Sequence, residues 1–251
     1  MLSKTEAIVL HAIKYGDKKV IVDMFTRQHG RLSFVVTLPK TAQGKLKKQY
    51  FQPLTLLTIE ADVRPQLQLQ KLRDASILTP LPTLLSNPAK LSISLFLSEF
   101  LFHALKGEQQ NAPLFDYVAS GIQWLDESER GYANFHLTFL MHLSRFLGFY
   151  PNLEERGELR VESGERVQNL YFDLRAATFC GAPPLHRDFL MPDEAGMLRL
   201  MMRMDFPTMH LFRLNREQRG RCIEVTLQFY RLHLPDFPDL RSLDVLKELW
   251  V

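Results

Sequence analysis

Lysine side chains gather in one short stretch of the chain, between residues 40 and 48. An ammonium group on a flexible stem neutralises phosphate oxygens without reading bases, so such a cluster suits a polyanion of any sequence. Two arginines flank a glycine turn about ten residues earlier. The sequence therefore predicts a nucleic-acid-binding surface formed by Arg27, Arg31, Lys40, Lys45, Lys47 and Lys48.

Two alternatives stay open for these cations. The lysines could belong to a solvated loop that only keeps the protein soluble. Arg31 could pair with Asp23 or Asp17 rather than continue the surface. Among nearby aromatic residues, alternation places Phe25 and Phe34 in the core, and Tyr50 and Phe51 are the candidates for stacking on bases.

A second basic cluster surrounds the predicted start of a long helix near the C-terminus. Cations there oppose the helix dipole, so they favour an anion from elsewhere as compensation. Glu217 and Glu224 could supply it locally, and a phosphate or an acidic peptide tail could supply it from outside. The cluster is therefore a candidate partner site or second DNA site, comprising Arg213, Arg216, Arg219 and Arg221.

Catalytic constellations are missing from the sequence. No GxxxxGK[ST], GxGxxG or GxSxG segment occurs. His136 and His142 are six residues apart on a predicted helix and face different directions. Cys180 and Cys222 form no CxxC pair of the kind that zinc sites use. We expect no enzyme, no cofactor and no metal site.

The first 80 residues have the period-two alternation of strands, interrupted at Gly16 and Gly30. Five short strands in about 75 residues suit a small barrel, and the OB-fold is the best-known five-stranded barrel that binds oligonucleotides. An SH3-like barrel fits the spacing almost as well. The expected strands are Ala7–Ile13, Val20–Phe25, Arg31–Val36, Leu54–Ile59 and Leu67–Leu72.

Residues 81–251 change to helical periodicity, so the fold class is α+β, with domains at 1–80 and 81–251. Asn87 and Pro88 resemble an N-cap and first helical residue, and Asn215 with Gln218 resembles a capping box. Residues 152–190 have weak periodicity and are predicted to be an irregular or β-hairpin insertion. The expected helices are Pro88–Leu105, Pro113–Leu125, Ala133–Leu147 and one beginning after Asn215.

Charge divides unequally between the two predicted domains. Residues 1–80 carry 13 lysines and arginines against six acidic residues, whereas the remainder carries 18 against 22. This asymmetry favours a localised polyanion site. The sequence has no apolar run near the roughly 20 residues of a membrane span, no signal core, and two cysteines, so we expect a cytoplasmic protein.

Several segments, in order along nearly the whole chain, resemble the RecO family of bacterial recombination mediators. They are Tyr15-Gly16-Asp17, the stretch from Phe25 to Ser33, Pro53-Leu54, Leu147-Gly148-Phe149-Tyr150-Pro151-Asn152, and Phe229 to Pro235 followed by Leu240 to Leu249.

The resemblance implies an N-terminal OB-fold and an α-helical C-terminal domain. It also implies DNA repair by recombination in the RecF-type pathway, through binding of single- and double-stranded DNA and annealing of complementary strands. The implied partners are RecR and the C-terminal tail of single-strand-binding protein. Together with RecR, such a protein helps to load RecA on DNA strands that are covered by single-strand-binding protein. Many RecO-like proteins carry paired zinc-binding cysteines after the Leu-Gly-x-x-Pro segment, but this chain has Glu154-Glu155-Arg156-Gly157 there.

Two other functions remain as alternatives. The small barrel could be a protein-interaction scaffold that binds an acidic partner, or it could bind RNA. Salt dependence separates the first from DNA binding, because phosphate contacts release counterions. A preference for RNA over DNA of equal length identifies the second.

Overall fold

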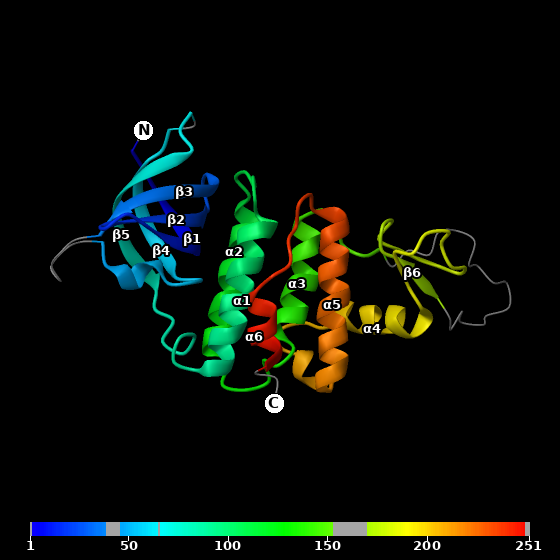
Figure 1. The fold of residues 1–251 in the computed structure, drawn as a ribbon. Coiled ribbons are helices and arrows are strands. Elements are labelled where there is room, and N and C mark those ends of the chain that lie inside the picture. The colour runs from blue at the N-terminus through cyan, green and yellow to red at the C-terminus, as the bar shows by residue number, and fades with distance from the viewer. Residues whose placement is uncertain (1, 39–45, 65, 153–169, 249–251) are drawn as a thin grey trace. The chain divides into compact units, whose positions relative to one another are not determined.

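The computed structural model describes residues 2–38, 46–64, 66–152 and 170–248. Its contacts divide the chain into two compact units. Unit 1 combines Met1–Ser128 with Asp239–Val251, and unit 2 is Glu129–Pro238. Figure 1 labels α1 to α6 and β1 to β6.

Unit 1 begins with a closed five-stranded barrel. Branched and aromatic residues alternate along its strands, and the inward set, which includes Val22, Phe34 and Ile59, is fully buried. The short 3-10 helix η1 (Lys48–Phe51) precedes β4. The strands are β1 (Leu2–Tyr15), β2 (Lys19–Thr26), β3 (Gly30–Thr37), β4 (Leu56–Asp62) and β5 (Leu69–Thr79).

The barrel closes because β1 is long enough to pair on both sides. Its first half pairs with β4 and its second half with β2, and the strand order is β1-β2-β3-β5-β4. Strands β3 and β5 run parallel, and the other pairs are antiparallel. This is the strand order of the OB-fold, so the predicted five-stranded barrel and the α+β class are confirmed.

A bulge in β1 joins the barrel to a helix. The register of β1 against β2 shifts between Val9 and His11, which takes Leu10 out of the ladder. The carbonyl of Leu10 accepts a hydrogen bond from the hydroxyl of Ser98, on α1 (Pro88–Ala104). The bulge therefore fixes one helix against the barrel wall.

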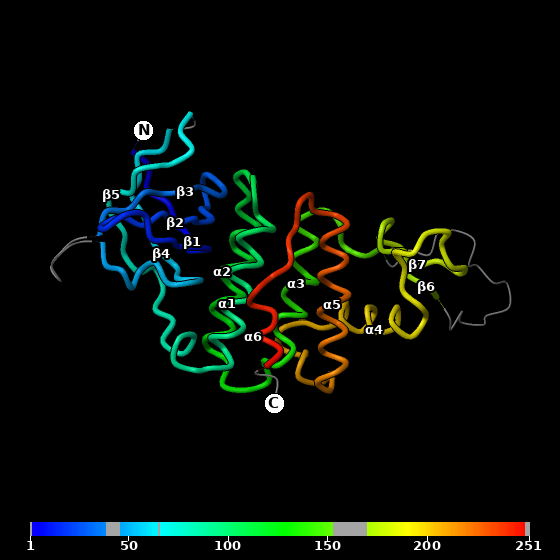
Figure 2. The backbone as a smooth tube through the Cα atoms, in the orientation of Figure 1, coloured from blue at the N-terminus to red at the C-terminus, as the bar shows by residue number. Residues whose placement is uncertain are grey.

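Among the described residues, three α-helices complete unit 1: α1, α2 (Ala112–Glu127) and α6 (Ser242–Glu248). The predicted N-cap of α1 is confirmed, since the Asn87 side chain accepts the N–H of Ala89 at 3.0 Å. The tube in Figure 2 shows α6 beside α1, with which it makes contact. The last described residues of the chain therefore pack with the first 128.

The described residues of unit 2 form three α-helices, the short 3-10 helix η2 (Met209–Leu211) and a small antiparallel sheet. The α-helices are α3 (Phe135–Phe146), α4 (Pro192–Met202) and α5 (Arg216–His233). The capping box of Asn215 and Gln218 opens α5 as predicted. The Tyr230 hydroxyl of α5 donates to the carbonyl of Leu140 at 2.7 Å, which ties α5 to α3.

The predicted insertion at 152–190 includes ordered strands. β6 (Tyr171–Asp173) and β7 (Thr178–Cys180) form a hairpin, and β8 (Phe189–Leu190) pairs with the other side of β6. Residues 153–169 of the insertion lie outside the described residues. Helix α4, which the sequence analysis did not propose, directly follows β8.

The domain boundary predicted at residue 80 lies between the end of β5 and the start of α1, and it stays a prediction.

Candidate nucleic-acid interface

The lysine cluster is described only in part. Lys47 and Lys48 are exposed at the start of η1, whereas Lys40 and Lys45 lie outside the described residues. η1 is held to the barrel by Phe51, which is 5% exposed within the core cluster. The two described lysines therefore project from a firmly packed turn.

Three further lysines lie at the same end of the barrel and were missed by the sequence analysis. Lys14 is near the end of β1, and Lys18 and Lys19 open the path into β2; all three are exposed. The Leu38 N–H donates to the carbonyl of Lys18 at 2.8 Å, so the turn is tied to the end of β3. The signal for them was their position on either side of the Tyr15-Gly16-Asp17 turn.

A groove of about 990 Å³ in unit 1 is lined by these three lysines, by Lys48 and by residues of other elements. Its lysines come from β1, the β1–β2 turn, β2 and η1, and Asp17 of that turn also lines it. The other wall is formed by α1, α6 and Arg241, which precedes α6. Within the described residues, none of its four lysines forms an ion pair. Those four groove lysines are Lys14, Lys18, Lys19 and Lys48.

Glu99 is the acidic side chain of the α1 wall of the groove, and its carboxylate is hydrogen-bonded to residues at the start of the α6 segment. Its carboxylate accepts the N–H of Arg241 at 3.1 Å, the N–H of Ser242 at 2.8 Å, and the Ser242 hydroxyl. Burial alone raises the pKa of Glu99, but the hydrogen bonds from Ser242 and Arg241 outweigh it and hold the pKa below its usual value. Glu99 thus fixes α6 against α1.

Arg27, a predicted site residue, forms two ion pairs within unit 1. Its guanidinium is 3.0 Å from a carboxylate oxygen of Glu6 and 3.0 Å from one of Asp116 on α2. Its side chain is 42% exposed. It therefore links the β2–β3 turn to a helix, and DNA contact by Arg27 stays a prediction.

Arg31 is more enclosed, with 13% of its side chain exposed. Its guanidinium donates to the main-chain carbonyl of Phe102 at 2.5 Å and lies 4.3 Å from the centroid of the Phe102 ring. It is also 3.5 Å from a carboxylate oxygen of Asp23. Asp23, and not Asp17, is therefore its partner. DNA contact by Arg31 also stays a prediction, and these contacts give it a structural role.

The aromatic residues of the barrel divide as follows. Phe25 and Phe34 are fully buried, as alternation predicted. Phe51 is also in the core, so it is poorly placed to stack on bases, and Tyr50 is half-buried against the same cluster. Tyr15, at the end of β1, is 54% exposed.

The second basic cluster is spread around the start of α5. Arg219 is half-buried and donates to the Asn134 side chain and to the carbonyl of Leu214; burial lowers its pKa. Arg221 is 2.6 Å from Glu194 and 3.7 Å from Glu224. Arg213 and Arg216 are exposed. The structure thus leaves three of the four facing solvent.

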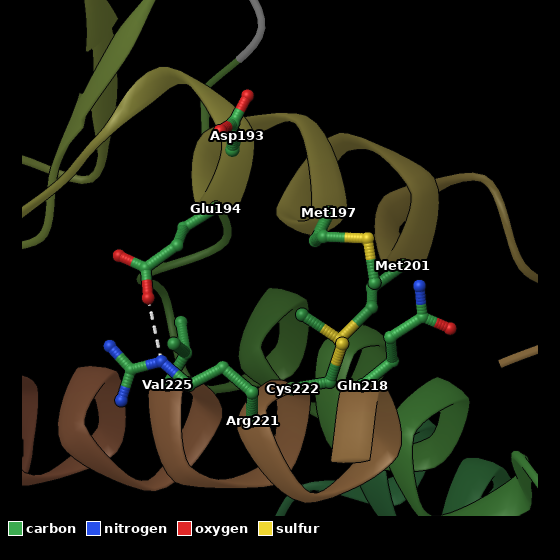
Figure 3. Close-up of a pocket in the computed structure, with 8 residues that line it drawn as sticks. All are labelled: Asp193, Glu194, Met197, Met201, Gln218, Arg221, Cys222 and Val225. Carbon is green, nitrogen blue, oxygen red and sulfur yellow. Dashed lines mark hydrogen bonds and ion pairs between the residues drawn. The ribbon is translucent and has the colours of Figure 1, made fainter. Parts of the chain in front are cut away.

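A pocket of about 300 Å³ lies between α4 and α5, next to Arg221 (Figure 3). Met197, Met201 and Val225 give it an apolar wall, and the Arg221–Glu194 ion pair lies at its side. Burial raises the pKa of the Cys222 thiol in the pocket to about 11, so this cysteine is a neutral wall residue.

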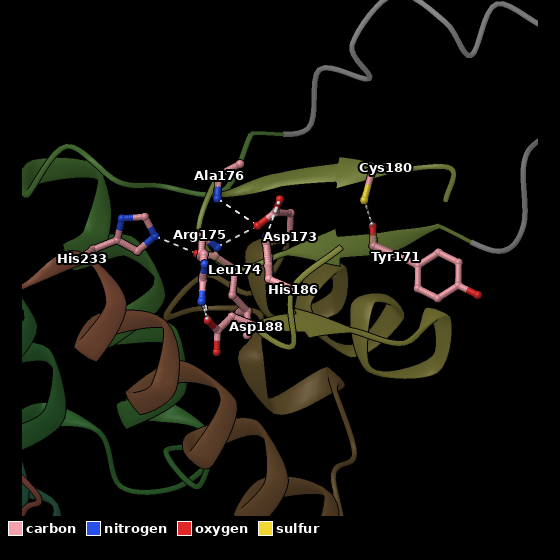
Figure 4. A network of polar contacts seen from close by, with 9 residues as sticks. All are labelled: Tyr171, Asp173, Leu174, Arg175, Ala176, Cys180, His186, Asp188 and His233. Carbon is pink, nitrogen blue, oxygen red and sulfur yellow. Dashed lines mark hydrogen bonds and ion pairs between the residues drawn. The ribbon is translucent and has the colours of Figure 1, made fainter. Parts of the chain in front are cut away.

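The region that follows the Leu-Gly-x-x-Pro segment holds a network of polar contacts (Figure 4). Asp173 accepts the N–H groups of Arg175 and Ala176 and lies 3.3 Å from His186. Arg175 donates to Asp188 at 2.6 Å. Within the described ranges, no group of three histidine, cysteine or acidic side chains is arranged to hold a metal. Hydrogen bonds and ion pairs thus cross-link β6 to the segment before β8.

No helix in the described part of the chain combines the length and the apolar character needed to cross a membrane.

Comparison with known proteins gives full-length matches. Residues 1–81 match the family model "Recombination protein O N terminal", and residues 85–244 match "Recombination protein O C terminal". Proteins named "DNA repair protein RecO" from Phocaeicola vulgatus and Bacteroides fragilis are each 48% identical, over 250 and 251 residues. One from Porphyromonas gingivalis is 32% identical over 254 residues. Each alignment covers 100% of both chains.

Proposed function

Since this chain belongs to the RecO family of DNA repair proteins, we propose that it is a non-enzymatic recombination mediator of the RecF pathway. It binds single- and double-stranded DNA and anneals complementary strands. The observation that carries the proposal is the groove of unit 1, where four exposed lysines from β1, the β1–β2 turn, β2 and η1 line one cavity.

The mechanism is electrostatic. Each lysine ammonium that meets a phosphate releases condensed counterions and reduces the repulsion between two DNA chains. Two complementary strands can then approach closely enough for base pairing to begin without ATP. Because lysine makes point-charge contacts, the groove accepts any base sequence.

Fluorescence anisotropy across a salt series tests the lysine groove. The probe is a short labelled oligothymidine, and the variant carries alanine at all four groove lysines. Each lost phosphate contact reduces the slope of log affinity against log salt by roughly 0.7 on a single strand, so four lost contacts reduce it by about 3.

A charge-matched control carries alanine at four exposed cations outside the groove: Lys106, Arg130, Arg187 and Arg203. We expect the control to keep most of the wild-type slope and annealing rate. If the groove variant and the control lose affinity equally, the loss reflects net charge alone and the groove is not the site. If wild-type protein does not bind at low salt, the scaffold alternative is favoured; tighter binding to RNA of equal length favours the RNA alternative.

For the tail of single-strand-binding protein, we propose the pocket between α4 and α5. An apolar side chain of the tail enters between Met197 and Met201, and its acidic residues face Arg221, the arginine of the pocket lining. A labelled peptide rich in aspartate with a C-terminal aromatic residue is the probe. Met197→Asp should weaken its binding at least about tenfold, whereas Leu200→Asp, on the same helix outside the pocket, should have little effect. Equal binding by both variants contradicts this site.

Cooperation with RecR to load RecA on covered strands, and a cytoplasmic location, are further parts of the proposal and rest on the family. Size-exclusion chromatography of the two purified proteins tests the first: a shared peak supports it, and separate elution at micromolar concentrations contradicts it.

A further inference from the structure

The groove of unit 1 has two chemically different walls. Its lysine side is formed by the ends of β1 and β2 and by η1. Its other side carries exposed apolar side chains: Leu95 of α1 is 37% exposed, and Val245 of α6 is 44% exposed. Ile13 of β1 is 44% exposed and also lines the groove.

A single strand of DNA has the same two-sided chemistry. Its phosphates lie along one edge, and its unpaired bases present apolar faces on the other. A duplex presents phosphates on its outside and stacks its base faces within the helix, so it can use the lysines but cannot use an apolar wall.

We infer that this groove is the single-strand site, with bases against Leu95 and Val245 and phosphates facing the groove lysines. The inference rests on the proposed function and adds to it a role for the C-terminal helix. α6 supplies part of the base-contacting wall, although it is separated from the barrel by more than 160 residues of sequence.

Glu99 positions the helical wall of the groove. Its carboxylate lies on the α1 side and accepts the main-chain N–H groups of Arg241 and Ser242, which holds α6 in place. Arg241 also lines the groove on this side. Glu99 therefore fixes the helix that supplies Val245 to the base wall.

An acidic peptide with apolar residues shares part of this chemistry. The strand is favoured because four lysines, from β1, the β1–β2 turn, β2 and η1, line the groove and form no ion pairs with described residues. Ammonium groups on flexible stems can each meet a phosphate, whereas a bidentate arginine is the usual partner of a carboxylate.

The test compares three probes of equal length: oligothymidine, an abasic oligonucleotide with the same number of phosphates, and a duplex. The variant is Leu95→Gln with Val245→Gln, which changes no charge. The matched control is Leu85→Gln with Leu200→Gln, two exposed leucines outside the groove. We expect wild-type protein to prefer oligothymidine to the abasic probe by about fivefold to tenfold, and the variant to lose that preference while its duplex affinity changes by less than about twofold.

Photocrosslinking of 4-thiothymidine to wild-type protein gives a second readout that does not depend on the variant's folding. Crosslinks in the peptides of α1 and α6 are expected. Equal wild-type affinity for oligothymidine and the abasic probe, or crosslinks confined to other segments, overturns the inference. If the groove-lysine variant loses binding but the glutamine variant behaves as wild type, the role of Leu95 and Val245 is overturned. The proposed function then still stands. If the acidic peptide displaces labelled oligothymidine at a lower concentration than unlabelled oligothymidine does, the groove is a peptide site instead.

Discussion

Gly30 lies directly against the main-chain carbonyl of Glu108. The N–H of Arg31 donates to that carbonyl at 3.0 Å, and a Cβ placed on Gly30 would be 2.3 Å from the same oxygen. The φ of Gly30 is +68°. The β2–β3 turn therefore docks on the segment between α1 and α2 only because this position has no side chain.

Substitution of this glycine should destabilise unit 1 strongly. Gly30→Ala adds a backbone clash to the left-handed strain. Gly16→Ala is a matched control, because Gly16 has φ +72° but nothing within 4 Å of an added Cβ. We expect about 1 kcal/mol of destabilisation for Gly16→Ala and about 3 kcal/mol or more for Gly30→Ala. Urea unfolding measures both; equal losses would show that the segment at Glu108 moves away freely.

Lys90 should be a structural lysine. It is 3% exposed, and its ammonium donates to the Thr83 hydroxyl and to the carbonyl of Asp126, each at 2.7 Å. Lys90→Met removes both of these charge-assisted hydrogen bonds, at a cost of about 2–3 kcal/mol. The exposed Lys106→Met should change the free energy of unfolding by less than about 0.5 kcal/mol. Similar values for the two would contradict a structural role.

Acidification should weaken unit 2 through His136. This ring is fully buried, and burial, with a smaller contribution from Arg219, lowers its pKa from 6.5 to about 3. The unfolded chain takes up a proton below pH 6.5 and the folded chain does not until about pH 3, so stability falls as pH decreases across that range.

The loss approaches about 1.4 kcal/mol per pH unit. Urea unfolding at pH 7 and pH 5 measures it, and His136→Leu should remove much of the difference. An unchanged pH dependence in His136→Leu would assign the acid sensitivity to other groups.

The C-terminal helix should detach from α1 at low pH. The pKa of Glu99 is depressed in the folded protein, so the stabilisation that its carboxylate gives α6 is present above the ordinary value near 4.5 and is lost as pH falls through the folded pKa. The protection of the α6 amides from hydrogen exchange, taken relative to the intrinsic rate at each pH, should fall over that range. Glu99→Gln should show faster α6 exchange already at pH 7, while the exchange of α2 serves as the internal control.

Removal of metal ions should leave the protein unchanged. In the described part of the sheet β7-β6-β8, the Arg175–Asp188 and Asp173–His186 contacts form cross-links of the kind that a zinc ion makes elsewhere. Chelation by EDTA should therefore not move the melting temperature. If EDTA lowers the melting temperature by several degrees and added zinc restores it, the protein has a metal site that includes residues outside the described ranges.

Much of the fold follows from local sequence. The five strands, the cap at Asn87 and the capping box at Asn215 each depend on neighbouring residues, and each is confirmed. Helix α4 was missed because its apolar periodicity is short and it begins at Pro192 after a region of weak pattern.

The candidate site could be predicted only in part. The basic character of the first 80 residues and one of the four groove lysines, Lys48, came from the sequence. Lys14, Lys18 and Lys19 were missed because their grouping with Lys48 depends on barrel closure. The internal contacts of Arg27 and Arg31 also required the structure, since Asp116 and Phe102 are more than 70 residues away in sequence.

The sequence by itself determined most of the elements, the charge asymmetry and the lack of a catalytic motif, because periodicity, caps and glycine turns act over a few residues. The tertiary structure decided which cations face one cavity and which wall opposes them. Leu95 and Val245 meet the lysines only because β1 closes the barrel and the C-terminal segment packs on α1. Such contacts are set by packing between distant segments, which no local pattern specifies.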